Sequence, residues 1–268
     1  MSIADADLER MAEDLFRAER DRTQIPLLSQ RFPEAGLKEA YRVQGALVKR
    51  KEAAGLTRKG WKIGLTSKAM QSALNITTPD SGVLFDDMFF SDGSRIPADR
   101  FIQPRVEAEI AFVMKAPLEG PGVTLFDVLN ATDYIVPALE ILDTRIVRSD
   151  SETGKARTIF DTISDNAANA GIAMGGRPVR PLDADMRWIG AIVSRNGEVE
   201  ETGLGAGVLN HPGTGIVWLA NRLAEYGSKI AAGEVVLSGS FIRPIEARHG
   251  DTISADFGPY GSVSLYFE

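Results

Sequence analysis

The amino-acid sequence predicts a mixed α+β fold, in which a helical N-terminal portion packs on a large, curled, mostly antiparallel sheet. Apolar residues with helical spacing are confined to the region before residue 55 and to one late segment, residues 213–227. Runs typical of strands, of varied length, fill most of the rest. Few helical segments separate these runs, which argues against a regular βαβ alternation.

Two amphipathic helices are expected before the strands begin. The first is indicated by apolar residues at spacings of three and four within an otherwise charged stretch: Leu8, Met11, Ala12, Leu15 and Phe16. The second runs from about Leu37 to Ala54 and ends at Gly55. We therefore expect a helical portion over residues 1–58 and a β-rich catalytic domain over residues 59–268, joined as one continuous structural unit.

The β-rich portion contains seven segments that we predict to hold strands. They are residues 60–65, 105–114, 133–142, 170–176, 187–203, 234–239 and 251–268. Asn196-Gly197 inside the fifth segment is typical of a two-residue hairpin turn. A late helix is expected from Gly213, ending at Gly227.

Composition excludes several classes of site. The chain has 268 residues, a net charge of −7, no cysteine and two histidines. Disulfides, thiolate zinc, iron–sulfur clusters, a cysteine nucleophile and a multi-histidine metal site are therefore excluded. No basic block favours nucleic acid or an anionic membrane. The acidic N-terminal stretch lacks the apolar core of a signal peptide, and no run approaches a membrane span, so we expect a cytoplasmic protein.

Three glutamates interrupt apolar strands. Glu107 and Glu109 share one face of the strand at 105–114, and Glu140 lies in the strand at 133–142. A buried ionised carboxylate is costly unless it is paired or binds a metal. Any one of these residues could be an ordinary salt-bridged glutamate. The three together favour a site for a hard divalent cation such as Mg²⁺.

Two further residues are candidates whose roles the sequence leaves open. Lys62 lies in an apolar strand before Gly64, where it could act as an acid or base, form a Schiff base, or simply extend its ammonium group to water. Asp80 lies in what reads as a turn at 77–82, where it could cap the turn or serve as a general base.

Residues 161–171 are dense in small hydrogen-bonding side chains, including Ser164. They read either as an ordinary loop or as a loop that grips a carboxylate. The glycines at 203–207 have neither the spacing nor the surrounding βαβ unit of a nucleotide loop, so a turn is predicted there. His211 is expected to cap the late helix and is given no catalytic role.

The chain as a whole resembles a known family. The segments that carry the resemblance are residues 60–70, 86–90, 104–109, 161–171 and 208–212. They are similar to the 2-oxo-hept-4-ene-1,7-dioate hydratases of homoprotocatechuate catabolism. These enzymes belong with 2-hydroxypentadienoate hydratases and 4-oxalocrotonate decarboxylases in the fumarylacetoacetate-hydrolase-like superfamily. The similarity extends over nearly the whole chain, and the stretch 145–160 favours the heptenedioate hydratases.

The resemblance implies a mixed β-roll like the C-terminal part of fumarylacetoacetase, a homo-oligomer, and Mg²⁺ or Mn²⁺ held by Glu107, Glu109 and Glu140. It also implies that Lys62 and Asp80 are catalytic. The expected reaction is the addition of water to a 2-oxo (or 2-hydroxydienoic) diacid, with the loop that contains Ser164 as the expected anchor for its second carboxylate. Association with a neighbouring pathway enzyme is a further expectation.

Three alternatives remain open at this point: a decarboxylase using the same site, a hydratase of the five-carbon substrate, and a non-catalytic subunit stabilised by metal. The presence of Lys62 and Asp80 together with the three glutamates argues against the last.

Overall fold

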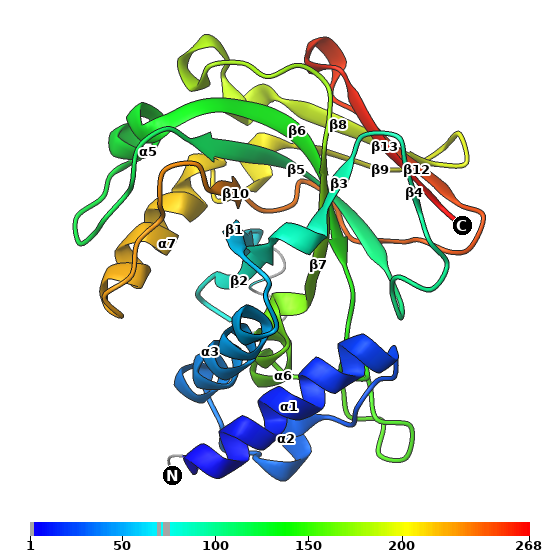
Figure 1. The fold of residues 1–268 in the computed structure, drawn as a ribbon. Helices are drawn as coiled ribbons and strands as arrows, with labels where there is room; N and C mark the ends of the chain where they lie inside the picture. Colours follow the sequence, from blue (N-terminus) through cyan, green and yellow to red (C-terminus); the bar gives the residue numbers. More distant parts are fainter. Residues whose placement is uncertain (1–2, 69–70, 72–75) are drawn as a thin grey trace.

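The N-terminal helices form a layer beneath the sheets in the computed structural model, which describes residues 3–68, 71 and 76–268 (Figure 1). The helices are α1 (Asp5–Asp21), α2 (Leu28–Arg31) and α3 (Leu37–Ala53), joined by the later α6 (Ile159–Ser164). Their apolar faces meet in one hydrophobic cluster that includes Met11, Leu15 and Leu47. The first two predicted helices are thus confirmed.

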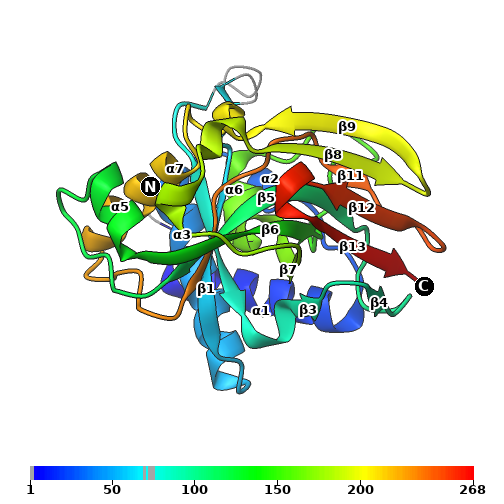
Figure 2. The same ribbon diagram turned by 90° about the horizontal axis from the view of Figure 1, so that it is seen from above.

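An eight-stranded sheet forms the centre of the molecule. Its order is β2-β1-β10-β5-β6-β7-β3, with β11 paired to β5 as well. The strands are β1 (Arg58–Gly64), β2 (Asp80–Phe85), β3 (Phe89–Ser91), β5 (Arg105–Met114), β6 (Thr132–Leu142), β7 (Asn169–Met174), β10 (Val235–Leu237) and β11 (Ile245–Glu246). Strands β5 and β6 arch over β1 and β2 (Figure 1), and in the view from above β5, β6 and β7 lie side by side across the middle of the molecule (Figure 2). The curled, mixed sheet of the prediction is confirmed.

A second sheet of five strands packs against the first, whereas the sequence suggested a single large sheet. Its order is β4-β13-β12-β8-β9. The strands are β4 (Ser94–Ile96), β8 (Gly190–Arg195), β9 (Glu198–Leu204), β12 (Thr252–Asp256) and β13 (Ser262–Phe267). The buried residues of both sheets belong to one core cluster, which is why the strands could not be assigned to two sheets from their pattern alone.

Among the described residues, two further helices lie at one end of the eight-stranded sheet (Figure 1). They are α5 (Leu125–Ala131), which the sequence did not predict, and α7 (Gly213–Ala224), which it did. The described ranges also contain six short 3₁₀ turns: η1 (Asp86–Met88), η2 (Asn166–Ala168), η3 (Pro181–Asp183), η4 (Met186–Trp188), η5 (Gly205–Gly207) and η6 (Gly258–Tyr260). The turn at Asn196-Gly197 joins β8 to β9 as predicted, with both residues at positive φ.

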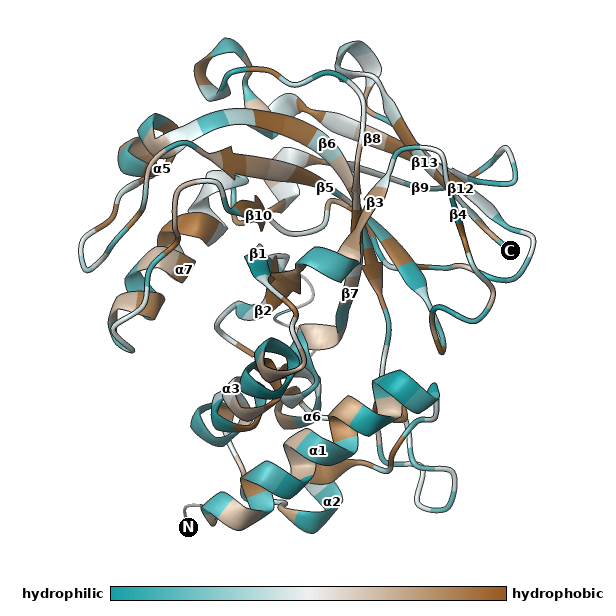
Figure 3. Ribbon diagram, in the orientation of Figure 1, coloured by the Kyte–Doolittle hydropathy of each residue, from teal (hydrophilic) through white to brown (hydrophobic). Residues whose placement is uncertain are grey.

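Hydropathy follows this layering. Brown, apolar residues run along β5, while α1 and α3 carry teal residues among their apolar ones (Figure 3). Helix α3 also contacts β2 and α6 through a polar side chain: Gln44 Nε2 donates to Ser81 O of β2 at 2.8 Å and to Ile163 O of α6 at 3.1 Å. The helical layer therefore holds the start of β2 in place. Over the described ranges, no helix has both the length and the apolar character required to cross a membrane.

Candidate metal and active site

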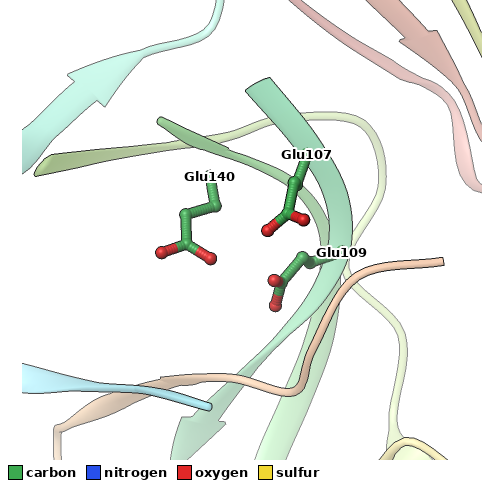
Figure 4. Close-up of side chains that lie close together, drawn as sticks. All are labelled: Glu107, Glu109 and Glu140. Atoms are coloured by element: carbon green, nitrogen blue, oxygen red, sulfur yellow. The ribbon is translucent and has the colours of Figure 1, made fainter. Parts of the chain in front are cut away.

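Three carboxylates converge on the concave side of the eight-stranded sheet. Glu107 and Glu109 come from β5 and Glu140 from the adjacent β6, and one oxygen of each lies within 4.8 Å of the others. Figure 4 shows the three side chains turned toward one common space. The alternation of side chains along β5 puts its two glutamates on the same face, and the antiparallel register puts Glu140 directly opposite Glu107.

The carboxylate oxygens of this cluster are short of hydrogen-bond donors. Glu109 Oε2 accepts the backbone N–H of Gly239 at 2.7 Å. Within the described part of the chain, no donor reaches Glu109 Oε1 or either oxygen of Glu140 with hydrogen-bond geometry. Buried oxygens without donors are costly, and an all-oxygen set of this kind fits a hard divalent cation such as Mg²⁺ or Mn²⁺. The donor set therefore fits the metal that the sequence predicted.

Without a cation, these carboxylates are pushed toward their protonated forms. Burial, followed by the charge of Glu140, raises the pKa of Glu107 to about 8. The same two causes raise the pKa of Glu109 well above its ordinary value. Burial also raises the pKa of Glu140, although Lys62 opposes the shift. A bound divalent cation would reverse this preference by favouring the ionised carboxylates.

Lys62 joins the carboxylate cluster from β1. Its Nζ lies 3.3 Å from Glu140 Oε1 and donates to Ala167 O at 3.2 Å, and only 4% of its surface is exposed. Burial opposes the charged form, but the neighbouring carboxylates, led by Glu140, raise the pKa of Lys62 above its ordinary value. The structure thus places a buried ammonium group beside the glutamates, and these neighbours favour its charged form.

Asp80 lies next to Lys62 because Gly64 has no side chain. The register of β1 and β2 pairs Gly64 with Asp80, and a Cβ placed at Gly64 would lie 2.3 Å from Asp80 Oδ1 and 3.2 Å from Lys62 Nζ. Asp80 is the first residue of β2, so its assignment to a turn was wrong. Burial raises its pKa, which favours a carboxyl that holds a proton more tightly than usual.

One cavity of about 860 Å³ connects these groups to solvent. Lys62, Asp80 and Glu107 line it together with Leu142 and Phe241. A volume of this order is typical of a site for a small molecule. The structure therefore brings five of the six residues predicted for the site to one place: Lys62, Asp80, Glu107, Glu109 and Glu140.

Ser164 lies apart from that set. It is the last residue of α6 and fully buried, and it is not among the residues that line the cavity. The interpretation of residues 161–171 as a loop was wrong, because they form the end of α6, the turn η2 and the first residues of β7. A contribution of Ser164 to substrate binding stays a prediction. His211 Nδ1 accepts the N–H of Gly213 at 3.0 Å, which confirms its place at the start of α7.

Arg157 is a lining residue of the cavity that the sequence did not single out. It is half-buried, and its Nη1 donates to Thr144 Oγ1 at 3.1 Å. Arg243 also lines the cavity, but its guanidinium is paired with Glu201 at 2.7 Å. The only sequence signal for Arg157 was its place in a polar stretch between a predicted strand and the cluster at 161–171.

Comparisons with known proteins extend these observations. The chain is 56% identical over 257 residues to 2-oxo-hept-4-ene-1,7-dioate hydratase of Escherichia coli, covering 96% of both chains. Its structure matches 4-oxalocrotonate decarboxylase from Pseudomonas putida G7, complexed with magnesium and adipate. That match has a TM-score of 0.93 and 36% identity, and it covers 100% of this chain and 99% of the other.

A more distant structural similarity concerns the fold alone. A fumarylacetoacetate hydrolase family protein from Yersinia pestis CO92 aligns with a TM-score of 0.57 at 16% identity, over 79% of this chain and 94% of that one. No family model matches the chain. The curled sheet is therefore of the fumarylacetoacetate hydrolase type, as the resemblance implied.

Proposed function

We infer the function of this chain from its family: it belongs to the 2-oxo acid hydratases and decarboxylases, and it is a lyase. We propose that it is a magnesium-dependent hydratase of 2-oxo-hept-4-ene-1,7-dioate, giving 4-hydroxy-2-oxoheptanedioate in the catabolism of aromatic compounds. The observation that carries the proposal is that Lys62, Asp80 and Glu107 line one cavity, with Glu109 and Glu140 clustered beside Glu107. The 56% identity to the hydratase of Escherichia coli favours hydration over decarboxylation.

The proposed metal ligands are Glu107, Glu109 and Glu140. The chemistry that Mg²⁺ would supply there is Lewis-acid stabilisation of the negative charge that develops on the 2-oxo oxygen. Mn²⁺ would suit the same oxygen donors. Glu109 Oε1 and Glu140 Oε2, which accept no hydrogen bond within the described part of the chain, support this assignment.

Lys62 is proposed to act as a fixed cation beside the reacting oxygen. Its raised pKa makes it a poor proton donor but a persistent positive charge. A buried charge of this kind stabilises an oxygen that becomes negative more effectively than the same charge in water. Lys62 does not need to form a Schiff base in this scheme, because its role is electrostatic.

Asp80 is proposed to move the protons. The dienol form of the substrate is 2-hydroxyhepta-2,4-diene-1,7-dioate. It gains a proton at C5 as its 2-hydroxyl loses a proton and becomes a ketone, which leaves a C3–C4 double bond conjugated to that ketone. A water molecule then forms a bond from its oxygen to C4 and loses a proton, and C3 gains one. A buried carboxyl with a raised pKa can both hold and release a proton in this sequence, and Asp80 meets that description.

Labelling of the product tests the reaction. The protein is incubated with Mg²⁺ and 2-hydroxyhepta-2,4-diene-1,7-dioate in ¹⁸O-water, and the label at C4 is located by mass-spectrometric fragmentation, since the 2-oxo oxygen exchanges with water unaided. We expect loss of the diene absorbance and one labelled oxygen at C4. Release of CO₂ from 4-oxalocrotonate at a higher kcat/KM than hydration of the diacid would assign the protein to the decarboxylases. A preference for 2-hydroxypenta-2,4-dienoate would retain the hydratase and exclude the seven-carbon substrate.

The oligomeric state, the location and the protein partner of the enzyme are predicted from the sequence alone. We expect a homo-oligomer, a cytoplasmic location and association with a neighbouring pathway enzyme. Light scattering of the purified protein, with and without the neighbouring enzyme, measures the two assemblies directly.

A further inference from the structure

Arg157 is a cation in the cavity wall without an anionic partner. Its guanidinium donates to a neutral acceptor, Thr144 Oγ1, at 3.1 Å. No carboxylate oxygen among the described residues lies within 4.0 Å of it. Two other arginines of this region are neutralised, because Arg145 is paired with Asp165 and Arg243 with Glu201.

A second arginine lies opposite Arg157. The N–H of Arg157 donates to Arg148 O at 2.9 Å, and the neighbouring residues Ser149 and Ala156 form a β-bridge. Like charges at facing positions of a β-ladder are unfavourable unless something compensates them. Among the residues that the structure describes, the only acceptor for the Arg148 guanidinium is a backbone carbonyl, Gln103 O, at 3.2 Å.

A third arginine adds to the positive potential. Burial, helped by the charges of Arg105 and Arg157, lowers the pKa of Arg148 to about 10. Burial also lowers the pKa of Arg157; the charge of Asp165 opposes this shift and that of Arg105 adds to it. None of the three forms an ion pair with a carboxylate in the part of the chain that the structure describes. Arg157 lines the cavity of the carboxylate cluster, whereas Arg148 and Arg105 line a separate cavity together with Gln103. Arg157 therefore presents an unneutralised positive charge to the candidate site, which an anionic group would compensate.

The position of this charge fits the far end of an extended diacid. Thr144, which accepts a hydrogen bond from the guanidinium, follows Glu140 by four residues. At roughly 3.3 Å per residue, the Cα atoms of Glu140 and Thr144 are therefore at most about 13 Å apart. A seven-carbon chain has six carbon–carbon bonds of about 1.5 Å each and spans roughly 8 Å. Leu142, between the two ends on β6, lines the cavity where such a chain would lie.

We propose that Arg157 binds the second carboxylate of the substrate, so that the cavity selects dicarboxylic over monocarboxylic 2-oxo acids. The guanidinium fork suits a planar carboxylate, and Arg148 and Arg105 reinforce its charge. This inference rests on the proposed function, and it assigns the distal anchor to Arg157 in place of the loop that contains Ser164.

The kinetic test compares two substrates of different length. Arg157→Gln lowers kcat/KM for 2-hydroxyhepta-2,4-diene-1,7-dioate by roughly 10- to 100-fold, the usual cost of losing a hydrogen-bonded charge partner. It leaves kcat/KM for 2-hydroxypenta-2,4-dienoate within about threefold, because that substrate has no second carboxylate. Arg157→Lys keeps the positive charge but cannot donate two parallel hydrogen bonds to a carboxylate, so its kcat/KM for the diacid falls by an intermediate factor.

The matched control is Arg243→Gln, which removes one positive charge from the same cavity wall where Glu201 already neutralises it. We expect it to leave the preference for the diacid unchanged. An equal loss of preference in both variants would show that overall potential, not Arg157, selects the substrate. An equal fall on both substrates in Arg157→Gln, at an unchanged Tm, would also overturn the inference while the hydratase assignment stands.

Binding measurements separate this inference from the reaction. Calorimetric titration of the Mg²⁺-loaded protein with 2-oxoheptanedioate and 2-oxopentanoate requires no turnover. The unmodified protein binds the diacid more tightly, and Arg157→Gln or Arg157→Lys narrows that difference. If the variants narrow this difference in affinity but the protein hydrates neither substrate, Arg157 binds the second carboxylate and the proposed function is wrong. Equal affinity of the unmodified protein for both acids would reject the anchor.

Discussion

Glu107 on β5 and Glu140 on β6 are directly opposite each other in the antiparallel register, both on the face that lines the cavity side of the sheet. Facing carboxylates repel each other, and burial adds the cost of removing both from water. Lys62 compensates only part of this charge, since its Nζ reaches Glu140 Oε1 alone among the three glutamates at salt-bridge distance. The sheet therefore carries an electrostatic cost that a divalent cation would remove.

The first prediction concerns the stability of the metal-free protein. The pKa of Glu107 is raised from 4.5 to about 8, so the folded chain binds more protons than the unfolded chain between those values. The free energy of unfolding must then fall as the pH rises through that window. Thermal unfolding in EDTA should give a lower Tm at pH 8 than at pH 5.5, and Mg²⁺ should reduce the difference because it binds the ionised folded state.

A variant of the same cluster controls this measurement. Glu140→Gln removes the facing charge, so the fall in Tm between the two pH values should become smaller in EDTA, and Mg²⁺ should restore less. A Tm that rises with pH in the metal-free protein would mean that the carboxylates are not destabilising.

The second prediction concerns Glu109. Its Oε2 accepts the N–H of Gly239 at 2.7 Å, and a glutamine can keep that hydrogen bond while losing the charge. Glu109→Gln should therefore preserve the fold and weaken Mn²⁺ binding, measured by electron paramagnetic resonance, by more than roughly tenfold. Changes to residues that only support metal ligands already cost 10–100-fold or so. Glu119→Gln, an exposed glutamate paired with Lys229, is the control and should bind Mn²⁺ normally. Unfolding of Glu109→Gln would indicate a structural role instead.

The sequence predicted the chemistry of the site better than its geometry. Buried strands containing Glu107 and Glu140 were recognisable because a carboxylate in an apolar run is costly, but their register depends on how the whole sheet pairs. Asp80 was placed in a turn because its neighbours Thr78 and Pro79 are typical of one, whereas pairing with Gly64 extends β2 to include it. Arg157 was not predicted because its importance depends on having no carboxylate partner among the described residues, and this can be seen only in the folded chain.

The third prediction concerns Lys62. Lys62→Met keeps most of the side-chain volume but removes the charge that faces Glu140, so kcat should fall by about 10²- to 10³-fold while KM changes much less. Lys59→Met, at an exposed position of the same strand, should leave both parameters unchanged. Borohydride added during turnover should trap no adduct, since the proposed role is electrostatic. A covalent adduct at Lys62 would replace that role with a Schiff base.

The last prediction tests whether the spacing of Lys62 and Asp80 matters for the reaction. A methyl group at Gly64 would lie 2.3 Å from Asp80 Oδ1 and 3.2 Å from Lys62 Nζ, so Gly64→Ala must displace the carboxylate. Displacements of about 1 Å in a reacting group can cost on the order of 10²-fold in rate. We expect kcat to fall by at least that factor, with a Tm close to that of the unmodified protein, because the Asp80 side chain can rotate away.

Gly45→Ala on α3 is the matched control: its methyl group meets nothing within 4 Å, and alanine favours a helix by roughly 0.5–1 kcal/mol. Normal turnover by Gly64→Ala would remove Asp80 from the proposed mechanism.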